Sequence, residues 1–121
     1  MTILNLTQHC ATPDQIEAGV IDLKEVDRAI LSDIITFEKL PNRLQIAAAV
    51  SMAVSLCARY DAEKAMIGGA PFLMEPMVTG LKKSGIQPIF AFSKRESKEI
   101  QKDDGTVEKV AVFRHEGFVS A

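Results

Sequence analysis

The residues best suited to proton transfer stand near the start of the chain. Thr7, Gln8 and His9 directly follow the mostly apolar run Ile3–Leu6. Histidine is the side chain whose ordinary pKa lies nearest neutral pH, so His9 is a candidate general acid or base. Thr7 and Gln8 are candidate ligand-binding residues beside it. The alternative is a structural histidine whose ring hydrogen-bonds locally to Thr12 or to a backbone carbonyl.

A glycine turn in the middle of the chain is suited to binding an anion. Gly68-Gly69-Ala70 follows a short apolar run and precedes a helical pattern. Successive backbone N–H groups at a helix start form a concave site that attracts a phosphate. The alternative is that two glycines simply permit a tight turn. Neither G-x-G-x-x-G nor G-x-x-x-x-G-K-[ST] is present, so neither a dinucleotide fingerprint nor a Walker loop is indicated.

Two adjacent cations follow the strongest strand pattern in the chain. Lys94 and Arg95 come directly after Pro88–Phe92, where Arg suits a bidentate phosphate contact and Lys acts as a point charge. Ser93 offers a hydroxyl donor, and Glu96 is placed to orient Arg95. We therefore consider Lys94 and Arg95 catalytic candidates, with Ser93 and Glu96 as ligand-binding residues. The alternative is a solvated polar turn that opens a hairpin.

The two cysteines indicate neither a disulfide framework nor a metal site. Cys57 lies in an Ala-rich apolar run and is expected to be a small buried hydrophobic residue. Cys10 follows His9, where a thiolate nucleophile is conceivable. No Cys or His pair has metal-ligand spacing, so we expect neither a metal nor a cofactor.

The elements that position these residues alternate between strand and helix, which predicts one Rossmann-like α/β domain over residues 1–121. We expect a mainly parallel sheet with helices on both faces, closed by a C-terminal β-hairpin. Ligands bind at the carboxyl ends of strands in such sheets, so the three segments should converge there. The expected strands are 3–6, 20–23, 65–67 and 88–92, the helices 13–19, 25–35, 43–60 and 72–83, and the hairpin strands 98–102 and 106–114.

Composition limits the partners. The 14 Lys and Arg against 16 Asp and Glu give a formal charge of −2, which argues against broad binding of duplex nucleic acid. The apolar run 46–58 is interrupted by Ser51 and Ser55 and falls short of a membrane span, and no leader opens the chain. We therefore expect a cytoplasmic protein. Apolar side chains cover almost all sides of the helix 43–60, which favours a homodimer over a helix wrapped within one subunit.

Taken together, the motifs resemble those of a known family. They are similar to those of small stand-alone CRISPR-associated Csx-type proteins. The similarity lies in the opening strand with its polar-His step and A-T-P-D-Q and in the G-G-A turn. Above all, it lies in F-A-F-S-K-R-E-S followed by D-D-G-T-V-E-K-V-A-V-F-R-H-E-G-F. Those proteins are similar to CARF-domain sensors, and some are ring nucleases. The resemblance implies a CARF-like fold and a homodimer that holds a cyclic oligoadenylate on its two-fold axis. By position it assigns the ligand to His9, Gly68, Gly69, Lys94 and Arg95.

The leading hypothesis is therefore a homodimer that binds a cyclic oligoadenylate second messenger in CRISPR-linked antiviral signalling. It leaves open whether the ring is also cleaved, as a metal-independent phosphodiesterase would do. One alternative is a non-enzymatic interaction or accessory protein on a Rossmann-like scaffold. Another is a small enzyme that binds a mononucleotide or another phosphorylated metabolite.

Overall fold

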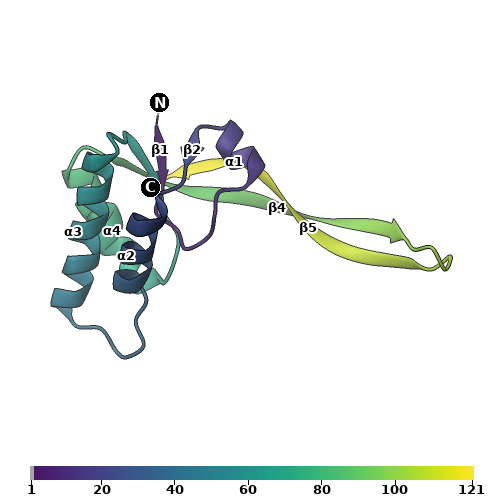
Figure 1. Ribbon diagram of the computed structural model, residues 1–121, viewed down its shortest axis with the longest axis horizontal. Coiled ribbons are helices and arrows are strands. Elements are labelled where there is room, and N and C mark those ends of the chain that lie inside the picture. The colour runs from purple at the N-terminus through teal and green to yellow at the C-terminus, as the bar shows by residue number, and fades with distance from the viewer. Residues whose placement is uncertain (1) are drawn as a thin grey trace.

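The computed structural model describes residues 2–121 as a mixed α/β body from which a long two-stranded arm projects (Figure 1). The helices and strands follow the order predicted from the sequence. They are β1 (Ile3–Asn5), α1 (Pro13–Glu17), β2 (Val20–Ile21), α2 (Glu25–Ile35), α3 (Arg43–Arg59), β3 (Lys64–Met66), α4 (Pro71–Lys83), β4 (Gln87–Gln101) and β5 (Val107–Ser120).

The sheet has five strands in the order β2-β1-β3-β4-β5. β1, β2, β3 and the first part of β4 pair in parallel, and β5 pairs antiparallel with β4. The chain leaves β1 toward β2 and later returns past β1 to form β3 on its other side. The direction of the connections thus reverses between β1 and β3, and in open α/β sheets such a switch point is where ligands bind.

The two faces of the sheet are covered unequally. Helices α2, α3 and α4 pack on one face, where Leu4, Leu56 and Leu81 are almost completely buried. The opposite face carries a smaller cluster around Val20 and Met66, beside the short helix α1. Three helices thus cover one face of the sheet, and the short helix α1 lies beside the smaller cluster.

Local sequence signals account for where the helices begin. Thr12 and Gln15 form a reciprocal capping box at the start of α1, and Asn42 and Gln45 form another at the start of α3. Such boxes satisfy two of the otherwise free backbone N–H groups at a helix start. Pro71 opens α4, where the missing N–H costs nothing. Pro76 lies inside α4, yet α4 continues as one helix to Lys83.

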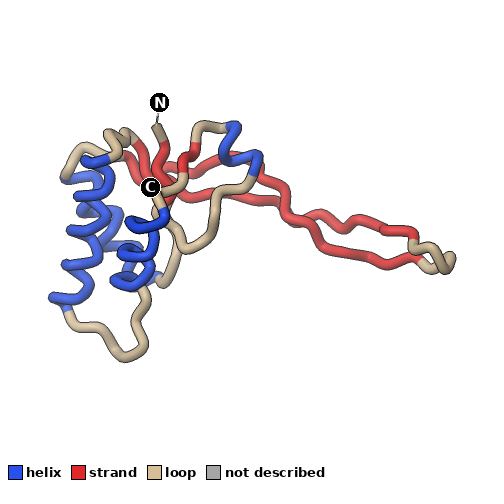
Figure 2. Tube along the Cα trace, viewed as in Figure 1, coloured by secondary structure: helices blue, strands red, loops and turns tan. Residues whose placement is uncertain are grey.

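The arm is where the sequence prediction and the structure differ most. We expected a strand to end at Phe92 and a separate hairpin to begin near Lys98. Instead β4 continues to Gln101 and pairs with β5 over the whole length, with one register irregularity between Phe92 and Ser93. Figure 2 shows both strands extending far beyond the other elements. The expected turn over Asp103-Asp104-Gly105 is confirmed, with Gly105 at φ +85°.

The long helix α3 is only partly covered. Ala49, Ala53, Leu56 and Cys57 are buried against the body, whereas the side that carries Ser51 and Ser55 is exposed in the single chain. Within residues 2–121, no helix combines the length and the apolar character that crossing a membrane requires.

Candidate functional site

A cavity of about 770 Å³ lies at the switch point between β1 and β3. Two of the three predicted segments line it, because β1 and β3 are parallel neighbours and the loops that follow them leave the same edge of the sheet. The side chains and backbone around the cavity come from Thr7, Gln8, His9, Cys10, Thr12, Gln15, Ile35, Thr36, Phe37, Met66, Ile67, Gly68, Gly69, Ala70, Phe72, Leu73, Phe90 and Ala91. The predicted convergence of residues 7–9 with residues 68–70 is confirmed.

The loop after β1 is shaped by a residue that sequence reasoning missed. The side chain of Asn5 is buried, its Nδ2 donates to the carbonyl oxygen of His9 at 2.7 Å and to Asp22 Oδ1 at 2.8 Å, and its Oδ1 accepts from the Thr7 backbone N–H at 2.9 Å. The Asn5 amide therefore bends the chain back on itself and presents residues 7–10 to the cavity. The available signal was a lone amide within an apolar strand.

The hydroxyl of Thr7 also forms hydrogen bonds within this loop. Thr7 Oγ1 donates to Asn5 Oδ1 at 2.6 Å and lies 3.1 Å from the carbonyl oxygen of His9. Thr7 lines the cavity, but these contacts occupy its hydroxyl. Gln8 is tied to the end of α2, since its Nε2 donates to Thr36 Oγ1 at 3.2 Å.

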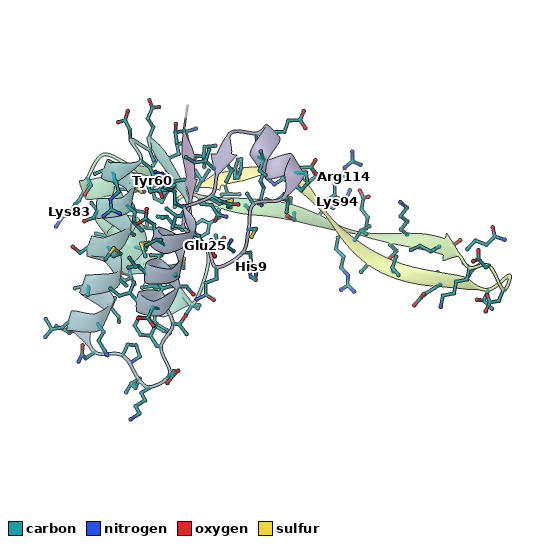
Figure 3. All side chains as sticks on the ribbon, viewed as in Figure 1. His9, Glu25, Tyr60, Lys83, Lys94 and Arg114 are labelled. Atoms are coloured by element: carbon teal, nitrogen blue, oxygen red, sulfur yellow. The ribbon has the colours of Figure 1, made fainter. Side chains whose placement is uncertain are left out.

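His9 is exposed and lines the cavity. Among residues 2–121 its imidazole makes no hydrogen bond, so the alternative of a ring fixed by Thr12 or by a backbone carbonyl is not what the structure shows. The position of the loop is set through the backbone of His9, which leaves the ring available to a molecule in the cavity. In Figure 3, His9 lies on the loop between the helices and the arm, apart from the labelled Lys94 and Arg114.

Cys10 is exposed at the same cavity and contacts a cation. Arg28 Nη1 lies 2.7 Å from Cys10 Sγ, and Arg28 Nη2 donates to the carbonyl oxygen of Gln8 at 3.3 Å. The hydrogen bond to Cys10 raises the pKa of the Arg28 guanidinium, which is charged in any case. Arg28 was not identified from the sequence, because it lies on α2 among residues of an ordinary amphipathic pattern.

The glycine turn supplies backbone donors. The N–H groups of Gly68 and Gly69 donate to no described backbone carbonyl, whereas those of Leu73 and Met74 already bond to Ala70 within the first turn of α4. Gly69 has φ +154°, a conformation that favours glycine. A Cβ at Gly68 would lie 3.7 Å from Thr7 Cγ2, so the two loops touch at this point.

Part of the cavity lining is aromatic and aliphatic. The rings of Phe37 and Phe72 lie 5.9 Å apart between centroids at an angle of 51°, and the side chain of Phe72 is half exposed. Phe90, from β4, forms another part of the wall. The cavity lining thus combines polar groups of residues 7–10 and 68–70 with the rings of the phenylalanines. Its described lining contains no Lys, Arg, Asp or Glu.

The third predicted segment does not join the cavity. Ser93, Lys94, Arg95 and Glu96 lie within β4 on the arm and are absent from the lining, so the expectation that they follow a strand end is wrong. The physical reason is the pairing with β5, which supplies hydrogen-bond partners past Phe92 and keeps the strand extended. Successive residues of a strand face opposite sides, so Lys94 and Arg95 do not act on one surface.

Lys94 instead shares a face with a cation that the sequence analysis did not single out. Its cross-strand neighbour is Arg114, and Figure 3 shows the two side by side on the arm. The His115 ring, which belongs to the other face, packs on Phe118 with centroids 4.8 Å apart.

Within residues 2–121 no group of three or more His, Cys, Asp or Glu side chains is arranged to hold a metal ion.

The sequence as a whole places the chain among known proteins. A family model described as the Uncharacterized protein MJ1673 family matches residues 1–119. The chain belongs to this family. No curated protein and no solved structure matches it. The matched residues include both the body and all but the last two residues of the chain.

Proposed function

We propose that the cavity between β1 and β3 binds a nucleotide, with a phosphate at the Gly68 and Gly69 amides and a base against the phenylalanines. The strand order and the reversal between β1 and β3 support a Rossmann-like class for this fold, in which ligands occupy this position. Free N–H groups before the first turn of α4 suit an anion, because the helix dipole places partial positive charge there.

The observation that carries the proposal is the presence of two chemically different kinds of group in one cavity lining. Backbone amides of the glycine turn and the imidazole of His9 line the cavity together with the rings of Phe37 and Phe72. A nucleotide has the same division, since its phosphate is charged and its base is a flat ring that stacks on aromatic side chains. A purely apolar ligand would leave the amides without partners.

Among nucleotides, we propose a cyclic oligoadenylate, bound by a homodimer in CRISPR-linked antiviral signalling. The support is the motif resemblance described above, which spans most of the chain and is most distinctive over residues 90–118. The cavity adds a site for an adenine ring and for one phosphate in each chain. The resemblance places one ring on a two-fold axis, whereas the cations that it assigns to the ring, Lys94 and Arg95, lie on the arm. The number of rings per chain therefore has to be measured.

Ring cleavage is a second candidate activity, and His9 favours it. In this step the ribose 2′-oxygen attacks the neighbouring phosphorus and the 2′-proton passes to the His9 imidazole. The bond from phosphorus to the 5′-oxygen breaks, which leaves a 2′,3′-cyclic phosphate and a 5′-hydroxyl that takes its proton from water. The amides of Gly68 and Gly69 would stabilise the charge that develops on the phosphate. Since the described lining holds no Lys or Arg, the rate would rest on positioning and backbone dipoles and would be slow.

The binding experiment uses the full chain with cyclic tetra-adenylate, cyclic hexa-adenylate and AMP, measured by titration calorimetry with and without EDTA. Gly68→Val places a side chain over the amides, and Phe72→Ala removes a half-exposed ring; each should weaken binding at least 10-fold. Lys94→Ala combined with Arg95→Ala is the matched control on the arm and should change affinity less than 3-fold. Circular dichroism confirms that each variant is folded.

The outcomes separate the functional classes. Binding that survives Gly68→Val but is lost in the arm variant would move the site to the arm and reject the cavity. Tight AMP binding without ring binding would favour the mononucleotide enzyme, and no binding of any of the three would favour the accessory protein. Products separated after incubation in EDTA test cleavage, and His9→Gln should remove them while leaving affinity within 3-fold.

A further inference from the structure

The arm presents an edge of β5 that pairs with no other strand among residues 2–121. Lys102 N–H donates to the Thr106 carbonyl at 2.8 Å, and from this pair the hydrogen bonds of an antiparallel ladder alternate along the strands. In β5 the odd-numbered residues 107–113 therefore turn their N–H and C=O groups away from β4. A projecting ribbon of two strands is marginally stable in water, and such free groups are a template for a further strand.

The two edges of the arm differ in how they are protected. Five of the six β4 residues from 94 to 99 are charged, and charged residues are the usual device that prevents strand addition. Over residues 107–114, β5 carries only three charged residues, Glu108, Lys109 and Arg114, among Val107, Val110, Ala111 and Val112, with Val107 59% and Val112 39% exposed. β-Branched residues on an uncovered edge favour pairing. The composition thus directs a partner strand to β5.

We propose that β5 pairs edge to edge with β5 of a second copy of this chain, antiparallel, about a two-fold axis through Ala111. In this register Ala111 faces Ala111 of the partner subunit, which uses the outward backbone groups of both. Val112 faces Val110 of the partner subunit, and Arg114 faces Glu108 of the partner subunit, each twice by symmetry. The occupant is a second copy because the sequence around Ala111 is complementary to its own reverse.

Charge complementarity selects this register over its neighbours. Centring the axis on Val110 would set Val112 against Glu108 and Arg114 against Thr106. Centring it on Lys109 would set two lysines against each other. The Ala111 register would also compensate a like-charge pair on the arm. Lys94 and Arg114 are direct cross-strand neighbours, and such pairs destabilise a ribbon. Glu108 of the partner subunit would lie beside Arg114 and supply the opposite charge.

This pairing gives an interface for the homodimer of the proposed function, and it rests on that proposal only in requiring two copies of the chain. In this register the partner's Gly117 would lie opposite Gly105, twelve residues along the strand from Gly117. At ~3.3 Å per residue, the points where the two arms leave their bodies would be about 40 Å apart. Each body would then keep its own cavity, and the dimer would bind one nucleotide per chain. A single ring on the dimer axis would contradict this arrangement.

The test exchanges the charges of two exposed side chains. Alone, Arg114→Glu sets acid against acid and Glu108→Arg sets base against base, so each variant should be a monomer by native mass spectrometry at micromolar concentration. Wild type should be a dimer. An equimolar mixture of the two variants should restore a dimer, and it should consist of one copy of each. Arg95→Glu, on the β4 edge, is the control and should leave the dimer intact.

Several results would overturn the pairing. They are a monomeric wild type, a dimer that survives both single charge reversals, loss of the dimer in Arg95→Glu alone, and mixed variants that do not associate. A dimer that persists in both variants would point to the exposed side of α3. Nucleotide affinity of the monomeric variants is measured in parallel: if it equals that of wild type per chain, the cavity proposal stands whatever the arm does.

Discussion

The body and the arm of this protein are stabilised in different ways. In the body, residues far apart in sequence bury one another, and polar groups such as Asn5 and Asp27 are buried and hydrogen-bonded. In the arm, β4 and β5 pair with each other, and the described side chains between Lys94 and Arg114 are at least partly exposed. Burial between distant parts of the chain holds the cavity in place, whereas the arm depends on the pairing of two neighbouring strands and on its exposed side chains. The experiments below test this division.

The largest effect is expected from Asn5→Ala in the body. The substitution removes donors to His9 and Asp22 and the acceptor for Thr7 in a buried place, and each buried group left unsatisfied costs about 1 to 3 kcal/mol. We expect a loss of about 3 kcal/mol in the free energy of unfolding, together with loss of nucleotide binding, measured by urea denaturation and calorimetry. A variant as stable as wild type would show that Asn5 does not hold the loop.

A pair of glycines compares the two regions directly. A Cβ at Gly80 in α4 would clash with Val50 Cγ1 of α3, and Val is stiff at χ1, so Gly80→Ala should cost about 1 to 3 kcal/mol. At Gly105 in the arm turn a Cβ meets nothing within 4 Å, but φ is +85°. Gly105→Ala should cost about 1 kcal/mol.

The two substitutions should differ in which part of the molecule loses stability. Gly80→Ala should lower the melting temperature of the whole body, whereas Gly105→Ala should speed hydrogen exchange only in the arm. Equal shifts in the global melting temperature would mean that arm and body unfold as one cooperative unit.

The response to pH should come from the body. The hydrogen bond from Tyr60, at 2.6 Å, is the main cause that holds the pKa of Asp27 below its usual value, and Arg59 at 2.7 Å adds to it, while burial opposes them. A carboxyl whose pKa is lowered by folding stabilises the fold above the unfolded pKa, and this contribution is lost as pH falls through the folded pKa.

The pH test compares wild type with Asp27→Asn. The difference in melting temperature should be largest near pH 7 and should shrink as the pH falls below about 4. Thermal unfolding from pH 3 to pH 7 measures it. A difference that does not vary with pH would assign the loss to packing rather than to the charge of Asp27.

The smallest effect concerns labelling rather than stability. Cys10 is exposed at the cavity, whereas Cys57 is enclosed and burial raises the pKa of its thiol to about 11. Iodoacetamide at pH 8 should therefore modify Cys10 in the native chain and Cys57 only after unfolding. A bound nucleotide should slow the modification of Cys10. Rapid native labelling of Cys57 would contradict the packing around α3.

The sequence was informative where the chain signals locally. Capping residues at Thr12 and Asn42, the proline at the start of α4, and the turn at Gly105 predict element boundaries, and the strands of the body follow from their apolar patterns. Two of the three site segments also follow, because the carboxyl ends of parallel neighbours must lie together. Thr7, His9 and Gly68 were therefore found without coordinates.

The remaining features depend on contacts between distant parts of the chain. A strand that runs past Phe92 depends on its pairing with β5, which no local pattern of polar residues such as Lys94 and Arg95 reveals. Asn5 and Arg28 owe their roles to Asp22, Cys10 and the loop backbone, and these partners are identified only in three dimensions.

The register irregularity between Phe92 and Ser93 lies one residue beyond the cavity wall. Phe90 and Ala91 on one side of it face the cavity, and Lys94 on the other side belongs to the arm. An irregularity of this kind is where a strand changes direction and twist. A single continuous backbone thus joins the ligand chamber to the protruding ribbon through one bend, so the angle of that bend sets how far the ribbon reaches from the chamber.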